Sequence, residues 1–187
     1  MQKTQWFIGL LILSVLAFTV LGLSRVQGQN DQVRRGKYFV DTIGACGQCH
    51  TPRKGAGPDM SMYLAGHPAN APFPNYNFGM MRQGIFMLTG PTMTSFAAPF
   101  GTTFAANLTA DKETGLGEWT EEMFVDAMKT GFHQGVKHNR KVLPPMPTKS
   151  YSGINSADLK AIWAFLKTVR AVKNEVPSAL NPRGRPW

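Results

Sequence analysis

Cysteine and acidic residues are scarce in this sequence. Its 187 residues include only two cysteines, Cys46 and Cys49, and 11 aspartates and glutamates against 20 lysines and arginines. Two cysteines are too few for a disulfide framework, and they leave no second cysteine pair for a zinc site. The formal net charge of +9 favours acidic partners or anionic surfaces.

Several enzyme motifs are also missing. The sequence contains no GxSxG nucleophile elbow, no HExxH zinc motif and no glycine-rich nucleotide loop. Charged residues make up only 17% and apolar residues 43%, which argues against wholesale disorder and against a bundle of membrane spans. No nucleic-acid recognition motif accompanies the basic charge. We therefore expect no nucleic-acid partner and no catalysis in the ordinary sense.

Residues 1–30 have the pattern of an export element. Lys3 precedes a largely apolar run from Trp6 to Leu23 that contains no charged residue, and polar residues follow at once. We predict a signal peptide cleaved near Val26-Gln27-Gly28 or, because the run is long enough to cross a bilayer, an uncleaved membrane anchor. In both cases the rest of the chain is expected in the periplasm or on the outer face of the cytoplasmic membrane.

Three helices are predicted around a long irregular segment. The predicted ranges are 31–43, 121–130 and 156–169, with caps at Asn30 or Asp31, at Thr120 and at Asn155 or Ser156. Gly36 costs stability inside a helix, so we expect another helix to approach closely there. Residues 51–118 show little periodicity but much Gly, Pro, Met and Phe, which predicts a segment that wraps something.

Cys46-Gly47-Gln48-Cys49-His50 matches CxxCH, the attachment pattern of c-type haem. Two thiols three positions apart can reach the two vinyl groups on one porphyrin edge, and the next residue then lies beneath the iron as its proximal ligand. A thioredoxin-like redox pair and half of a zinc site are the alternatives. We favour one covalent haem c, because the pair is expected to close a helix and because His67, His133 and His138 lack zinc-finger spacing.

A second axial ligand decides what the iron can do. Ten methionines compete, and we predict Met146, because Leu143-Pro144-Pro145-Met146-Pro147 is a rigid loop shortly before the last helix. The alternatives are a Met146 that only packs, and ligation by His133 or His138. Thioether ligation and an apolar pocket both predict a positive midpoint potential.

The other methionines have different expected roles. Met80, Met81 and Met93 lie in the wrapping segment, where we expect them in the haem-pocket wall or the core. A periplasmic copper-binding protein is the alternative that ten methionines and four histidines suggest. A peroxidase is a further alternative, but it requires an open sixth position on the iron.

The order of these features is similar to that of class I cytochromes c. An N-terminal helix with Gly36 and Tyr38 precedes CxxCH, a Pro-flanked Met and a terminal helix with Trp163 and Phe165. The similarity covers about residues 31–176. It implies an all-α fold, with few helices around one covalently bound haem and a long irregular wrapping segment.

The same resemblance implies that the first and last helices cross. The positions at the crossing would be Gly36, Tyr38 or Phe39 against Trp163 and Leu166. We expect residues 177–187 to form an extended strap or end, because they are rich in Pro and Arg.

The stretches 104–109 and 114–120 carry a narrower resemblance. They are similar to bacterial cytochromes c that accompany periplasmic or membrane-bound dehydrogenases and terminal oxidases. This implies an electron carrier whose redox partner is a dehydrogenase subunit, a terminal oxidase or another cytochrome. Such proteins often carry two or three similar domains, whereas one CxxCH here implies one haem.

Basic residues surround the Met146 loop in the sequence. They are Lys137, His138, Arg140, Lys141 and Lys149. If the loop lies at the haem edge, they form a basic rim that docks an acidic partner, and an ordinary solvated charge cluster is the alternative. Arg53 and Trp119 are candidates for binding the haem propionates.

Overall fold

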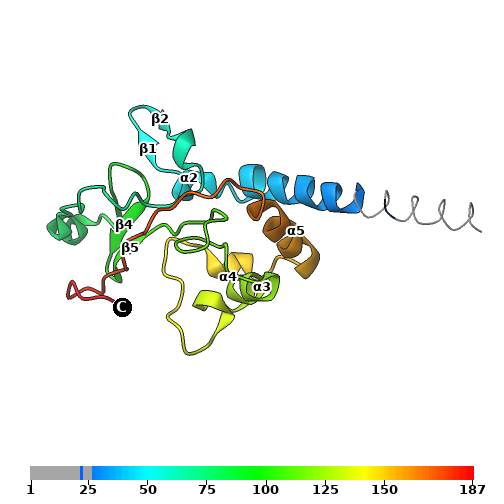
Figure 1. Ribbon diagram of the computed structural model, residues 1–187. Helices are drawn as coiled ribbons and strands as arrows, with labels where there is room; N and C mark the ends of the chain where they lie inside the picture. The colour runs from blue at the N-terminus through cyan, green and yellow to red at the C-terminus, as the bar shows by residue number, and fades with distance from the viewer. Residues whose placement is uncertain (1–21, 23–26) are drawn as a thin grey trace, which may run out of the picture.

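Two terminal helices cross at a glycine. The computed structural model describes residue 22 and residues 27–187, and residues 27–38 are helical and continue into η1 (Phe39–Ile43). Helix α5 (Ser156–Leu166) lies against this N-terminal helix (Figure 1). A Cβ atom on Gly36 would lie 1.9 Å from the carbonyl oxygen of Ala161, so no larger residue fits at the crossing. The predicted role of Gly36 is confirmed.

One side chain at the crossing differs from the prediction. Phe39 packs against the core cluster that contains Trp163 and Leu166. Tyr38 is 54% exposed, because two residues along an α-helix are about 200° apart and Tyr38 therefore lies away from the face of Gly36. An ion pair between Arg35 and Asp158 also joins the two helices, and the hydrogen bond from Arg35 lowers the pKa of Asp158.

Helices α5 and α3 begin at their predicted caps. The Asn155 side chain accepts a hydrogen bond from the Asp158 amide at 2.9 Å. The Thr120 hydroxyl accepts one from the Met123 amide at 3.1 Å, where α3 (Glu121–Thr130) starts. Gly131, with a positive φ of 72°, ends α3. Helix α5 ends at Leu166, before the predicted end at Val169.

The core lies between α3, α5 and the N-terminal helix. The rings of Phe124 and Trp163 are 5.6 Å apart between their centroids, which joins α3 to α5. The buried members of the core cluster are Val40, Leu64, Leu116, Phe124, Leu159, Ile162, Trp163, Phe165, Leu166 and Val169. The short helices are α2 (Gly47–His50), η2 (Met60–Met62), η3 (Phe78–Gln83), η4 (His133–Gly135) and α4 (Thr148–Tyr151).

The segment predicted to be irregular contains two small antiparallel sheets, so the all-α prediction is only partly met. Strand β1 (Arg53–Lys54) pairs with β2 (Gly57–Pro58), and a second sheet has the order β3 (Leu88–Thr89), β4 (Ser95–Ala98) and β5 (Gly101–Phe104). Every residue of β4 and β5 is buried. Their sequences therefore lack the alternation of apolar and polar residues that indicates a half-buried strand.

The end of the chain lies beside this second sheet. Thr102 of β5 and Leu180 exchange two backbone hydrogen bonds, each 2.8 Å long. Most of the predicted export element, residues 1–21 and 23–26, lies outside the described residues, and the division into 1–30, 31–176 and 177–187 stays a prediction. Within the described residues, no helix is both long and apolar enough to cross a membrane.

The glycine at the helix crossing gives the first prediction. We expect Gly36→Ala to lower the free energy of unfolding by about 2 kcal/mol, because the new methyl group overlaps the Ala161 carbonyl and forces the helices apart. Guanidinium unfolding followed by circular dichroism measures the change.

Gly28→Ala is the matched control in the same helix when both variants are made in the unprocessed chain. No atom lies within 4 Å of the position of a Cβ on Gly28, so this variant should keep or gain stability through helix propensity, by up to about 1 kcal/mol. Equal stability of Gly36→Ala and the wild type would show that the helices do not approach this closely.

Candidate haem site

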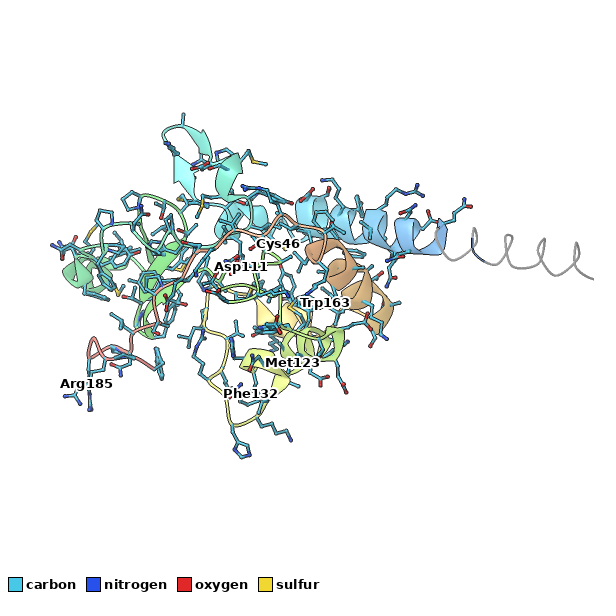
Figure 2. The ribbon with its side chains drawn as sticks, viewed as in Figure 1. Cys46, Asp111, Met123, Phe132, Trp163 and Arg185 are labelled. Carbon is cyan, nitrogen blue, oxygen red and sulfur yellow. The ribbon has the colours of Figure 1, made fainter. Side chains whose placement is uncertain are left out.

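The four predicted site residues line one cavity. Its volume is about 710 Å³, within the range of roughly 300–1,000 Å³ that is typical of cofactor pockets. Cys46, Cys49 and His50 come from the CxxCH motif, and Met146 comes from the loop before α4. Figure 2 labels Cys46, which lies near the middle of the molecule. Residues that are distant in the sequence therefore meet at one site.

The motif forms a short helix of its own, and this corrects the expectation that it closes the first helix. Ala45, with a φ of 46°, turns the chain out of η1. Cys46 caps α2, and its carbonyl oxygen accepts a hydrogen bond from the His50 amide at 2.9 Å. The two thiols are therefore separated by about one helical turn and can reach one edge of the same ligand.

A backbone carbonyl orients the His50 ring. Nδ1 of His50 lies 2.8 Å from the oxygen of Ala106. Because a carbonyl oxygen only accepts hydrogen bonds, Nδ1 carries the proton and Nε2 keeps its lone pair. Burial lowers the pKa of His50, which also favours the neutral ring. A neutral imidazole with a free Nε2 is the form that binds a metal ion.

The two thiols are held in their neutral form. Burial raises the pKa of Cys46 to about 11 and also raises the pKa of Cys49. A thioredoxin-like pair requires the opposite shift, because the thiolate is its nucleophile. The pKa values of the thiols thus argue against the redox-pair alternative.

The zinc alternative is a separate question. The described residues contain no group of three or more His, Cys, Asp or Glu side chains that could hold a metal ion.

Two of the predicted candidates for the sixth position lie at the cavity. Met146 and His133 are among the described residues that line it, and His138 is not. The His133 ring packs edge-on against Trp119, with centroids 5.1 Å apart. Burial and the nearby Arg140 lower the pKa of His133. Of the three residues predicted for the sixth position, Met146 and His133 therefore remain as candidates.

The methionines of the wrapping segment are not where we expected them. Met80, Met81 and Met93 are absent from the described residues that line the cavity or form the core cluster. Met93 is 43% exposed, in the turn between β3 and β4. The predicted wall position is therefore wrong for these three.

The cavity wall is largely apolar. The apolar side chains in it include Phe96, Phe104, Leu108, Leu116, Phe124 and Val142. Residues 104–108 and 113–116 also line the cavity. They include most of the stretches 104–109 and 114–120, which resemble cytochromes c that accompany dehydrogenases and oxidases. An apolar wall disfavours additional charge inside the cavity.

Part of the wall is a segment of which only residues 177–180 belong to the range 177–187 that was predicted as an extended strap or end. Residues 172–180, here called the strap, run from the end of α5 to β5, and most of them line the cavity (Figure 1). The Asn107 side chain donates to the Val172 carbonyl at 2.8 Å. The Asn174 side chain donates to the carbonyls of Ala65 and His67 at 2.7 and 2.9 Å. These two buried amides hold the strap in place.

The polar lining differs in part from the expected propionate partners. Trp119 lines the cavity, and its role toward a propionate stays a prediction. Arg53 lies in β1, donates to the Ala56 carbonyl and is not among the described lining residues. Arg140 and Lys173 line the cavity. Lys173 also forms an ion pair with Glu113. Arg140 belongs to the predicted basic rim, so at least one rim residue reaches the cavity.

The side chains at this cavity fit a covalently attached haem. Two free thiols, one neutral imidazole and one thioether converge on an apolar space of adequate volume. The thiols and the imidazole have the spacing that CxxCH provides, and the thioether is a known axial ligand of c-type haem iron.

Similarity to known proteins points in the same direction. No protein-family profile matches the chain. It is 26% identical over 170 residues to the fructose dehydrogenase cytochrome subunit of Gluconobacter japonicus, which covers 84% of this chain and 26% of that protein. It is 28% identical over 155 residues to the gluconate 2-dehydrogenase cytochrome c subunit of Pantoea cypripedii, with 83% and 26% covered.

A shorter match has a higher identity. Over 80 residues the chain is 38% identical to one of the subunits of nicotinate dehydrogenase from Pseudomonas putida, which covers 43% of this chain and 6% of that protein. The chain spans about a quarter or less of the length of these three relatives. Cytochrome c subunits of bacterial dehydrogenases are thus among the relatives of this chain, and at modest identity they support its relationship to the c-type cytochromes.

Proposed function

We propose that this chain is a single-haem c-type cytochrome that carries single electrons between redox partners, in the periplasm or on the outer face of the cytoplasmic membrane. The observation that carries the proposal is the cavity shared by Cys46, Cys49, His50 and Met146. When bound, haem c supplies the Fe(II)/Fe(III) couple for one-electron transfer. The single CxxCH motif supports one haem per chain.

Each site residue has a defined role in the proposal. Cys46 and Cys49 hold the haem through thioether bonds, and His50 binds the iron through Nε2 while the Ala106 carbonyl holds its Nδ1 proton. Met146 binds the iron from the loop before α4. We favour Met146 over His133, because the His133 ring already packs edge-on against Trp119, whereas Met146 lies in a proline-rich loop.

Filling both axial positions with side chains selects electron transfer over catalysis. A peroxidase needs one open coordination position, and Met146 would occupy it. A thioether ligand stabilises the ferrous state more than a second imidazole would. An apolar wall also stabilises the ferrous state, in comparison with a hydrated cavity. We therefore expect a positive midpoint potential.

The partner is proposed from the relatives and from the surface charge. Cytochrome subunits of dehydrogenases are among the relatives, which supports a dehydrogenase subunit as electron donor, with a terminal oxidase or another cytochrome as acceptor. Lys137, His138, Arg140, Lys141 and Lys149 are all exposed. With Arg140 at the cavity, these five residues form the proposed basic rim for an acidic partner.

The haem and its sixth ligand are tested together. The exported protein should carry one equivalent of haem c by pyridine haemochrome and intact mass, and should show the weak sulfur-to-iron absorption band. Met146→Ala should remove this band and allow carbon monoxide to bind the reduced protein, because the iron loses its second side-chain ligand.

Met128→Ala is the matched control, since Met128 also lines the cavity but lies on α3. It should keep the band and exclude carbon monoxide. A colourless protein with free or disulfide-bonded Cys46 and Cys49 would refute the proposed function. A wild-type protein that lacks the sulfur-to-iron band and excludes carbon monoxide, and that binds carbon monoxide in His133→Gln but not in Met146→Ala, would transfer the ligand role to His133.

The basic rim is tested with ferricyanide, an anionic electron acceptor. Oxidation of the reduced protein should slow as ionic strength rises, because salt screens the attraction between the rim and the reagent. Lys137→Gln/Lys141→Gln should lower the oxidation rate several-fold at low salt, because it weakens the electrostatic steering of the reagent. At high salt, the rate of this double variant should match that of the wild type.

Lys54→Gln/Lys112→Gln changes the net charge by the same amount at exposed positions outside the rim. This control should lower the rate much less. Equal effects of the two double variants would mean that overall charge, and not the rim, governs the encounter.

A further inference from the structure

Two stretches of the chain contain no acidic residue. Between Asp59 and Asp111 the sequence has no Asp or Glu, and Arg82 is the only Lys or Arg. No acidic residue follows Glu175 to the end of the sequence. The ionisable side chains in these two parts of the chain are thus neutral or positive, and none is acidic.

The first of these parts exposes large apolar side chains. Residues 73–93, here called the apolar lobe, include η3 and the turn that leads into β3 and β4. Phe86 is 74% exposed, although a phenylalanine is usually at least partly buried. The exposed apolar side chains of the lobe are Phe73, Phe78, Ile85, Phe86, Met87 and Met93. A concentration of this kind on one segment marks a contact surface.

The second part places basic and aromatic side chains on the same sheet. Leu180 pairs with Thr102 of β5, and the Phe73 ring of the lobe packs against Phe104 of β5 at 5.5 Å between centroids. Beyond Leu180 the chain exposes Arg183, Arg185 and Trp187. Figure 2 shows Arg185 at the end of the molecule, far from Trp163 of α5.

We propose that the apolar lobe and residues 183–187 dock on an anionic lipid surface. Exposed Phe, Ile and Met side chains can enter the boundary between headgroups and acyl chains, and Trp is favoured at that boundary. Arginines beside them attract anionic headgroups. Because these residues contain no Asp or Glu, no carboxylate side chain must be desolvated or brought near the lipid phosphates.

The charge pattern favours lipid over protein as the occupant. Two copies meeting at this end would bring Arg183 and Arg185 of each copy near those of the other, without an acidic residue on either lobe to neutralise them. An apolar protein partner would explain the lobe but not the basic and aromatic end. The proposed contact does not depend on the haem, so its failure and the failure of the proposed function can be separated.

Hydrogen exchange of the full chain, with and without vesicles, tests the proposal. Vesicles of phosphatidylethanolamine and phosphatidylglycerol should slow exchange in residues 78–93 and 179–187, but not in α3. We expect slowing by about tenfold or more in the lobe, which corresponds to burial of one large apolar side chain. Vesicles of phosphatidylcholine should give much less protection. Any contribution of residues 1–30 is common to all variants and does not report on the lobe.

Surface variants separate the two parts of the contact. Ile85→Ser/Phe86→Ser should abolish the protection of residues 78–93, because it removes the inserted side chains. Arg183→Gln/Arg185→Gln should reduce protection on the anionic vesicles only. Met60→Ser is the control, since Met60 is 64% exposed in η2 outside the lobe, and it should behave as the wild type.

Three outcomes would overturn the proposal. The first is unchanged exchange in residues 78–93 on anionic vesicles. The second is protection that Ile85→Ser/Phe86→Ser retains. The third is protection of the lobe without lipid that grows with protein concentration, which would assign this surface to a second copy of the chain.

Discussion

The hydrogen bond from His50 Nδ1 to the Ala106 carbonyl joins the two parts of the chain that build the cavity. On one side, the Gly36 crossing holds the N-terminal helix against α5, and this helix leads through η1 to the motif. On the other side, Ala106 precedes Asn107, whose side chain binds the strap at Val172. The amide of Gly66 also donates to the His50 carbonyl at 2.8 Å, so the ring and the backbone of this residue are both fixed. The imidazole is thus oriented before any ligand binds, which reduces the entropy lost on ligation.

The sequence predicts the parts of this arrangement that depend on local chemistry. The caps of α3 and α5, the Gly36 contact and the cavity position of the CxxCH residues and Met146 all have a local signal in residue type or spacing. The missed features depend on contacts between distant residues. Strands β4 and β5 are buried on both faces and show no alternation, the Ala106 oxygen belongs to the backbone, and nothing beside Asn174 in the sequence indicates that its amide binds two carbonyls of residues 65–67.

Lys167 illustrates the same limit on a smaller scale. A lysine near the end of a helix is expected to interact with the last carbonyls of that helix. Its Nζ instead donates to the carbonyl of Gly117 at 2.7 Å. Gly117 lies in the loop that connects the wall residues 113–116 to α3. The Lys167 Nζ also lies over the Trp163 ring, 5.0 Å from the centroid. The residue therefore fastens a wall loop to α5, and the charge that favours the helix end also positions the cavity.

The small number of acidic residues matters less than where they lie. All the acidic residues that form ion pairs in the described structure belong to the N-terminal helix with η1, to the start of α3 and α5, or to the loop at Glu113. These pairs lie on the helical side of the molecule and at the strap, so negative charge supports the elements that surround the cavity. Residues 60–110 and 176–187, which include the second sheet and the end of the chain, contain no acidic residue of their own. This uneven distribution thus places the paired acidic residues on the helices and beside the strap, and it leaves the sheet end with a charge that suits an anionic surface.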